Sequence, residues 1–377
     1  MRPHRWLTFA FITLNVALLV DFGSDLLEDR GISLTGLITL DPPPSPVVIR
    51  FDGHTLSVMG ALVQAGPPHR LSLRAWMPMP TIRVIEPGDL GPITLEVENL
   101  PLRVRLDASG PIEEDRQGPT RALRFAPQAT RRVGFTDLER EVTFAVLGDT
   151  GDSDTFRQAL RLAASQGADF LIHAGDLLYR DDQIPPLKEI LATSPLPIFT
   201  VRGNHDYRNA ARIDVMRGLS PAYYAFRIAG VTFIILDNGI NYIPTLWRGS
   251  TQYQWLTHVL GLPRDGPLVV AMHKPPFDPR PAPQEHAMED KEFALALRRS
   301  FARAGVDVVV TGHVHASYIW VRDDIPYVIS GEGFSSPEGR HCNRMAWVHV
   351  RGWEVAMAQI PIWGSAYAEP PCRKDMN

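Results

Sequence analysis

Polar side chains able to bind metal ions follow five apolar runs of the sequence. The runs lead into Asp149, Asp176, Asn204, His273 and the motif Gly312-His313-Val314-His315. An apolar run that opens into a loop is typical of a buried strand. In an open α/β sheet the carboxyl ends of neighbouring strands form one rim, where ligands bind. Carboxylate, amide and imidazole donors without a thiolate suit iron, manganese or zinc.

Three neighbouring residues extend these motifs. Tyr179 follows Asp176 on the same expected loop, and His205 and Asp206 directly follow Asn204. Each residue also has an ordinary interpretation, because Asp and Asn favour turns and a partly buried Tyr often only packs. Such turns at every one of these strand ends would be a much less probable arrangement than a binding site. His173, His286 and His341 match no ligand motif and are expected to be ordinary residues.

The motif order GD-x-G, GD-x-x-Y, GNHD, a lone His and GH-x-H resembles the calcineurin-like metallophosphoesterases, and among them the purple acid phosphatases. The resemblance covers Val142 to about Ile362. It implies a metal-dependent phosphoesterase with two metal ions that share one bridging carboxylate, Asp176. The implied ligands are Asp149, Asp176, Tyr179 and His315 for the first ion, and Asp176, Asn204, His273 and His313 for the second.

The first motif departs from the wider superfamily, in which most members have Asp-x-His. Here the motif is Asp149-Thr150-Gly151, so a histidine ligand is missing, and the resemblance lets Tyr179 replace it. A phenol has a pKa of about 10 in water, and a trivalent ion can lower it enough to bind phenolate. We therefore expect Fe(III) at the first site and divalent Fe, Zn or Mn at the second.

The resemblance implies hydrolysis of phosphate monoesters by a metal-bound hydroxide, as in acid phosphatases. Two cations neutralise the ester, lower the pKa of water and hold the attack in line. By analogy His205 stabilises transition-state charge and protonates the leaving group, and Asp206 orients His205. One alternative is a phosphodiesterase acting on nucleotides or lipid head groups at the same site. Another is an exported binding protein with a non-catalytic metal site.

The elements around these motifs predict an α/β domain over residues 141–365. Helices are expected at Thr155–Ala164, with Asp154 as N-cap, at Lys188–Leu191, at Gln252–Leu260 and at Lys291–Ala304. The strands and helices indicate a four-layer βαβ sandwich with two mixed sheets. Short alternating runs over residues 47–132 predict a small all-β sandwich in front of it, with a loosely ordered stalk as the alternative. Residues 126–141 form the expected domain boundary, and residues 366–377 a tail.

The net charge, the N-terminal residues and the cysteines bear on the compartment and the binding partners of the protein. The net charge of −4 gives no reason to expect nucleic-acid binding, so a small phosphate ester is the expected partner. Residues 1–21 contain a basic start and the apolar run 6–20, typical of a signal peptide or a membrane anchor. Both interpretations export the chain to the periplasm or the extracellular space, and an anchor would contact the membrane. Cys342 and Cys372 either form a disulfide or remain free thiols.

Overall fold

The structure is a computed structural model, and it describes residues 44–88, 91–240, 250–280, 286–333 and 343–362. The predictions for residues 1–21 and 366–377, for His341 and for the two cysteines lie outside the described residues. Within the part of the chain that is described, no helix is both long enough and apolar enough to span a bilayer.

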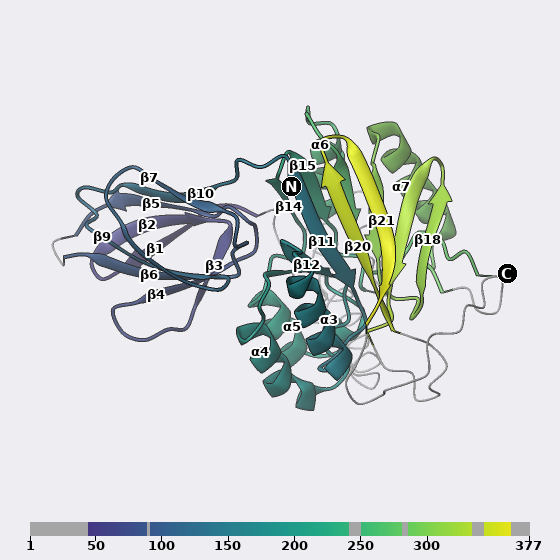
Figure 1. Ribbon diagram of the computed structural model, residues 1–377, viewed down its shortest axis with the longest axis horizontal. Helices are drawn as coiled ribbons and strands as arrows, with labels where there is room; N and C mark the ends of the chain where they lie inside the picture. Colours follow the sequence, from purple (N-terminus) through teal and green to yellow (C-terminus); the bar gives the residue numbers. More distant parts are fainter. Residues whose placement is uncertain (1–43, 89–90, 241–249, 281–285, 334–342, 363–377) are drawn as a thin grey trace, which may run out of the picture.

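The N-terminal lobe is a β-sandwich of two five-stranded sheets (Figure 1). Apolar and polar side chains alternate along its strands, as in Ile93–Glu98, where every second residue is buried. This alternation lets each sheet bury one face against the other. One sheet has the order β1 (Val47–Phe51), β2 (His54–Met59), β5 (Thr81–Glu86), β10 (Arg132–Thr136) and β7 (Arg105–Ala108). The other has the order β3 (Ala61–Gln64), β4 (Leu71–Ala75), β6 (Ile93–Glu98), β9 (Thr120–Phe125) and β8 (Glu113–Gln117).

The sandwich is ordered and extends further than the sequence predicts. Strand β10 lies within the expected boundary region, yet it pairs with both β5 and β7. The paired strands of the sandwich therefore extend to Thr136, past the predicted end at residue 132, and the first strand of the α/β domain begins at Glu141. The alternative of a loosely ordered stalk is wrong for this part of the chain.

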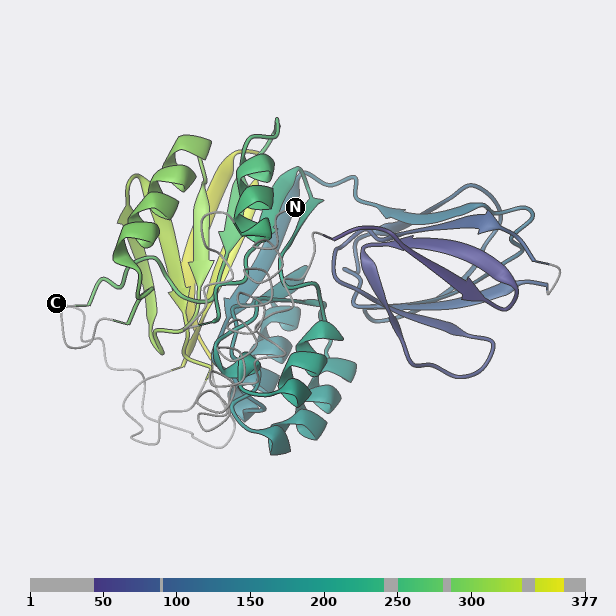
Figure 2. The ribbon, with the colours of Figure 1, turned by 180° about the vertical axis from the view of Figure 1, so that it is seen from behind.

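The α/β domain contains two mixed sheets (Figure 2). The first sheet has the order β13 (Ile198–Thr200), β12 (Phe170–His173), β11 (Glu141–Leu147), β20 (Arg344–Arg351) and β21 (Glu354–Pro361). The second has the order β14 (Tyr224–Ile228), β15 (Val231–Ile235), β16 (Leu268–Ala271), β17 (Val308–Thr311), β19 (Ile325–Ser330) and β18 (Ser317–Arg322). Strands β11, β12 and β13 are parallel, and so are β15, β16, β17 and β19.

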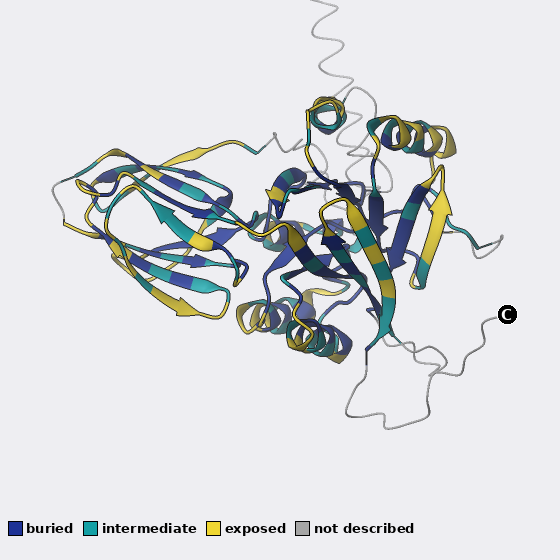
Figure 3. Cartoon of the chain, turned by 45° about the horizontal axis from the view of Figure 1, so that its top comes forward, coloured by how far each residue is buried: buried dark blue, intermediate teal, exposed yellow. Residues whose placement is uncertain are grey.

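Helices cover the outer faces of both sheets, which makes the predicted four layers. The first sheet packs against α3 (Asp154–Ser165), α4 (Ile184–Ala192) and α5 (Ala210–Arg217). The second packs against α6 (Thr251–Leu260) and α7 (Lys291–Ala304). Two short 3₁₀ turns, Asp181–Gln183 and His205–Tyr207, complete these elements. Figure 3 shows buried strands between helices that each expose one side.

Two helix starts differ from the predictions for local reasons. Helix α3 is capped by Ser153, whose hydroxyl accepts from the Phe156 N–H, so Asp154 lies in the first turn instead of at the cap. Helix α4 begins before the expected residue 188 and contains two prolines in its first turn. Proline is tolerated there, because the first N–H groups of a helix have no partner within it.

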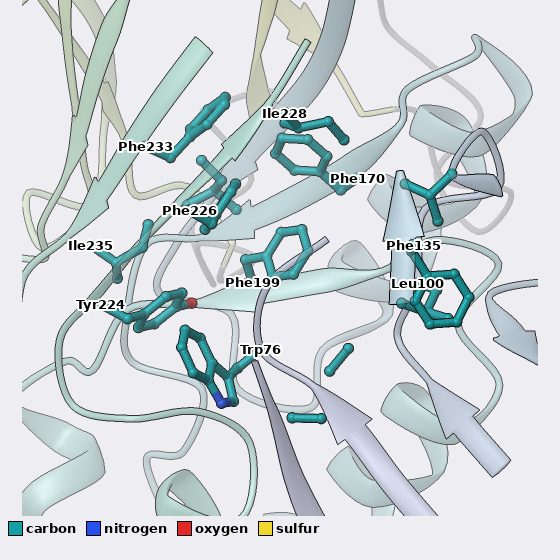
Figure 4. Packing of buried hydrophobic residues seen from close by; sticks show 14 of the residues in the cluster. Trp76, Leu100, Phe135, Phe170, Phe199, Tyr224, Phe226, Ile228, Phe233 and Ile235 are labelled. Atoms are coloured by element: carbon teal, nitrogen blue, oxygen red, sulfur yellow. The ribbon is translucent and has the colours of Figure 1, made fainter. Parts of the chain in front are cut away.

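Aromatic side chains fill the space between the two sheets of the α/β domain. Phe144 of the first sheet meets Phe233 of the second edge to face, with ring centroids 5.1 Å apart. The same core continues into the sandwich, where the Trp76 ring meets the Tyr224 ring edge-on at 5.5 Å (Figure 4). One continuous core therefore joins the two domains. Buried aromatic pairs of this kind add to the stability of the fold beyond the area that they bury.

Candidate metal centre

The predicted ligands lie where parallel strands of both sheets end. Strands β11, β12 and β13 of the first sheet lead into Asp149, Asp176 and Asn204, and β16 and β17 of the second lead into His273 and His313. The two rims meet directly, since the N–H of Gly148 after β11 donates to the carbonyl of Ser330 at the end of β19, at 2.7 Å. The fold therefore brings together residues that are up to 166 positions apart, from Asp149 to His315.

One group of donors forms around Asp149. Ligand atoms of Asp149, Asp176 and His315 all lie within 4.8 Å of one another. The Nε2 atom of His315 is 3.4 Å from Oδ1 of Asp149. The Tyr179 hydroxyl is 3.3 Å from the same Nε2 and 3.5 Å from the same Oδ1. Tyr179 thus lies beside the donors that the sequence assigns to the first ion.

A second group of donors forms around His273, which also lies close to Asp176. The Nε2 atom of His273 is 3.5 Å from Oδ2 of Asp176 and 3.0 Å from Oδ1 of Asn204. The His313 ring lies 4.9 Å from the His273 ring, centroid to centroid. Its Nε2 atom is buried and has no hydrogen-bond partner among the described residues. A buried polar atom without a partner is costly and calls for an explanation, and a metal ion would supply the partner.

Four of these donors have left-handed backbone conformations. The φ angles are 59° at Asp149, 58° at Asp176, 68° at His313 and 52° at His315. Such conformations are uncommon outside glycine, cost energy, and concentrate at functional sites. At each of these positions the chain turns sharply at or just beyond a strand end.

Glycines leave the space that the carboxylates and imidazoles occupy. A Cβ atom on Gly203 would lie 2.1 Å from Oδ1 of Asp176, and one on Gly175 would lie 2.3 Å from Nδ1 of His273. These distances are far below van der Waals contact. The glycines of the GD and GN motifs are therefore required by close approach between neighbouring loops.

The two buried carboxyl groups of the site, Asp149 and Asp176, are stabilised in their charged form by nearby positive charge. Burial raises the pKa of the Asp149 carboxyl. Burial acts the same way on Asp176, but His273 and His205 hold its pKa at about 2. Burial also opposes charge on His273, yet the Asp176 carboxylate raises the pKa of that imidazole to about 9. Two nearby buried carboxylates with imidazole, amide and phenol donors fit a pair of oxygen- and nitrogen-bound cations.

Asp206 has a different place from the one predicted. Its Oδ2 atom accepts from the N–H groups of Asp176 at 3.0 Å and Gly203 at 2.8 Å, and its Oδ1 from that of Leu178 at 3.0 Å. The carboxylate is thus occupied by backbone donors, which holds the Asp176 and Gly203 loops together. The prediction that Asp206 orients the His205 imidazole is replaced by this role.

His205 lies at the edge of the donor groups and is partly buried. Its ring packs against Tyr179 at a centroid distance of 4.4 Å. Its backbone N–H donates to Oδ1 of Asp176 at 2.8 Å, and its carbonyl accepts from Nη1 of Arg212 at 3.1 Å. Burial lowers the pKa of the imidazole, although Asp176 opposes that effect. These contacts fix the backbone and leave the ring beside the Tyr179 phenol.

The structure adds two residues that the sequence interpretation missed. The ring of His286, expected to be ordinary, lies 4.1 Å from that of His313. The side chain of Asn238 accepts from the N–H groups of His273 at 2.9 Å and Lys274 at 3.1 Å, and donates to the Lys274 carbonyl at 2.8 Å. No local pattern marks either residue, because each reaches the site only through tertiary packing.

His173 supports the site from behind. It is fully buried at the end of β12, and its Nε2 atom forms a 2.8 Å hydrogen bond with the hydroxyl of Thr150, next to Asp149. Burial lowers the pKa of this imidazole to about 3, so it is neutral at physiological pH.

Comparisons with known proteins agree with this geometry. Residues 142–317 match the calcineurin-like phosphoesterase family model. Purple acid phosphatase 21 of Arabidopsis thaliana is 32% identical over 199 residues, which cover 46% of this chain and 44% of the relative. The serine/threonine-protein phosphatase CPPED1 of Danio rerio is 29% identical over 187 residues, or 43% of this chain and 58% of the relative. The chain thus spans about half the length of the curated relatives it matches.

A solved structure extends the likeness of fold to most of the chain. The purple acid phosphatase PPD1 from yellow lupin (Lupinus luteus) seeds superposes with a TM-score of 0.50 and covers 83% of this chain and 78% of its own. With 12% identity, this likeness concerns the fold alone. The match to the calcineurin-like phosphoesterase family thus concerns residues 142–317, and purple acid phosphatases are among the proteins to which this chain is similar.

Proposed function

We propose that this protein is a dinuclear metal-dependent phosphoesterase that hydrolyses phosphate monoesters. The observation that carries the proposal is the position of Asp176 between two donor groups. One of its neighbours is the Asp149, Tyr179 and His315 group, and the other is the Asn204 and His273 group. A carboxylate has two oxygens and can bind two cations at once, so Asp176 is suited to hold them together.

The chain's own residues prepare the site for a phosphate ester. Bound cations supply the charge that neutralises the ester and the acidity that activates water. Asp206 fixes the loops of Asp176 and Gly203, and Asn238 fixes the loop of His273. His205, beside the Tyr179 ring, is the group available to hydrogen-bond the phosphoryl oxygens and to protonate the leaving alcohol.

The donor set supports different ions at the two positions. Tyr179 lies next to Asp149 and His315. Because the first motif has Gly151 and no histidine, Tyr179 can supply the missing donor. A phenolate is a hard donor, so we assign Fe(III) to this position and divalent Fe, Zn or Mn to the other. Purple acid phosphatases among the relatives support this assignment.

The substrate is a small phosphate ester outside the cytoplasm. The net charge of −4 provides no general attraction for nucleic acid. The basic start and the apolar run 6–20 favour export to the periplasm or the extracellular space, with membrane contact if this segment is retained.

Metal analysis and a substrate panel test the proposal. Purified wild-type protein should contain two ions per chain and hydrolyse p-nitrophenyl phosphate faster than bis-(p-nitrophenyl) phosphate. Asp176→Asn should lose metal and activity, because it removes one carboxylate oxygen from the shared position. Asp214→Asn is the matched control, since that side chain is 75% exposed on α5.

Each outcome separates the hypotheses. Faster hydrolysis of the bis-ester would favour the phosphodiesterase alternative. Two bound ions without turnover of either ester would favour the exported binding protein. Normal metal content and turnover in Asp176→Asn would refute the assignment of the bridge.

A further inference from the structure

Strand β13, which leads to Asn204 and His205, lies at the edge of its sheet. It has only three residues, Ile198–Thr200, and pairs on one side with β12. An edge strand presents backbone N–H and C=O groups that have no partner in the sheet. Here these groups are buried at the junction with the β-sandwich, so other parts of the chain must satisfy them.

Asn99 of the β-sandwich takes the place of a neighbouring strand. Its Oδ1 atom accepts from the Ile198 N–H at 2.7 Å, and its Nδ2 atom donates to the Ile198 carbonyl at 3.1 Å. The same Nδ2 donates to the carbonyl of Ala75 at 2.7 Å, which ties the amide to its own domain. Asn99 is only 5% exposed and has a φ of 68°. A buried Asn in this conformation satisfies both backbone groups of Ile198 at once.

A second contact holds the same edge two residues later. The hydroxyl of Tyr224 donates to the carbonyl of Thr200 at 3.1 Å. The Tyr224 ring packs edge-on against Trp76 of the sandwich, at an interplanar angle of 71° (Figure 4). The sandwich therefore supports β13 at Ile198 directly and at Thr200 through Tyr224.

The supported strand is directly linked to the metal centre. Three residues separate Thr200 from Asn204, and one of them, Gly203, already lies against Asp176 without room for a Cβ atom. A shift of β13 would move the Asn204 amide relative to His273, which is 3.0 Å away. Misplacement by about 1 Å at a reacting site can reduce the rate about 100-fold.

We propose that Asn99 is a positioning residue, through which the β-sandwich holds the loop that carries Asn204 and His205. This inference rests on the proposed function for its effect on turnover, but the effect on the loop itself is independent of it. The sandwich then acts as a structural part of the metal centre, although it contributes none of the expected metal ligands.

The decisive variant is Asn99→Gly. Glycine adopts a φ of 68° without strain, so the substitution removes the amide and leaves the backbone conformation. Tyr224→Phe is the second variant, because it removes the hydroxyl and keeps the ring against Trp76. Gln64→Ala is the matched control, since Gln64 also joins the domains, but its Nε2 donates to the Gly218 carbonyl at the end of α5, at 2.9 Å.

Three measurements on the full chain test the proposal. Hydrogen exchange should become faster in the peptide that contains residues 198–205 for Asn99→Gly and Tyr224→Phe, and remain at the wild-type rate for Gln64→Ala. For Asn99→Gly and Tyr224→Phe, titration with Zn²⁺ should show an affinity about tenfold lower at one of the two sites. This is the usual effect of removing a contact that orients a metal ligand. With p-nitrophenyl phosphate, kcat should fall about tenfold while KM changes less.

The outcomes distinguish this inference from the proposed function. Wild-type exchange rates in residues 198–205 of Asn99→Gly would overturn it, whether or not the protein is a phosphatase. Equal changes in Asn99→Gly and Gln64→Ala would also overturn it, since they would show a general loosening of the interface. If the wild type binds no metal and has no turnover, the proposed function fails, and the exchange result still decides the role of Asn99.

Discussion

Substituting Gly203 by Ala tests the tight packing at the centre of the site. The new Cβ atom would lie 2.1 Å from Oδ1 and 2.2 Å from the backbone nitrogen of Asp176. Non-bonded heavy atoms are most stable at about 3.5–4.0 Å, so the two loops must separate by roughly 1.4 Å. Gly203 does not have a left-handed φ, so the effect is steric rather than conformational.

The expected result combines a modest loss of stability with a large loss of function. Overpacking of this kind costs about 1–3 kcal/mol, and a displacement above about 1 Å should lower kcat/KM about 100-fold. Urea unfolding, metal analysis and hydrolysis of p-nitrophenyl phosphate measure the three effects. The metal position next to Asn204 should be the one that weakens, because Asn204 directly follows the substituted residue.

The matched control is Gly261→Ala at the end of α6. Its φ is −86°, and the nearest atom to its new Cβ, the His258 carbonyl oxygen, is 3.4 Å away. The control should change the free energy of unfolding by less than about 1 kcal/mol. If Gly203→Ala retains two ions and the wild-type rate, the close approach of the Asn204 loop to Asp176 is not required, and the arrangement described above is wrong.

Two further predictions concern the ions themselves. Tyr179→Phe removes the oxygen that lies 3.5 Å from Asp149 Oδ1 but keeps the ring. The iron-loaded wild type should absorb visible light, and the variant should lose that band and most activity, whereas an unchanged spectrum and rate would make Tyr179 a packing residue. An ion present at about 100 times its dissociation constant stabilises the native state. Removing it with a chelator should therefore lower the melting temperature by roughly 5–10 °C per ion. A scan of treated and untreated protein that gave equal midpoints would contradict metal binding by the native state.

Sequence reasoning predicted the site wherever local patterns carry the information. Strands leading into Asp149, Asp176 and Asn204 could be recognised because their apolar runs end at loops, and the family comparison confirms the class of protein. Helix α7 has the predicted bounds, Lys291–Ala304, since its apolar periodicity is regular and Asp290 and Gly305 mark its ends.

The features that the sequence did not predict depend on contacts between distant residues. Asp206 was expected to orient His205, its neighbour, but its carboxylate binds the backbone of Asp176 and Leu178, 30 and 28 positions away. Helix α5 was missed because its apolar face is weak and short. The place of Asn99 against Ile198 could not be predicted either, since nothing local indicates that an Asn in one domain closes the sheet of another.

The pairing in the first sheet also affects how the chain can fold during synthesis. Strand β11 is flanked by β12, which follows soon after it, and by β20, whose Arg351 pairs with Glu141. At about 5–20 residues per second, a ribosome needs about 10–40 s to make the roughly 200 intervening residues. Throughout that interval one edge of an apolar strand has no partner and is prone to aggregation. The sandwich, complete at Thr136, can fold early, whereas the first sheet is complete only after β20 and β21 have emerged.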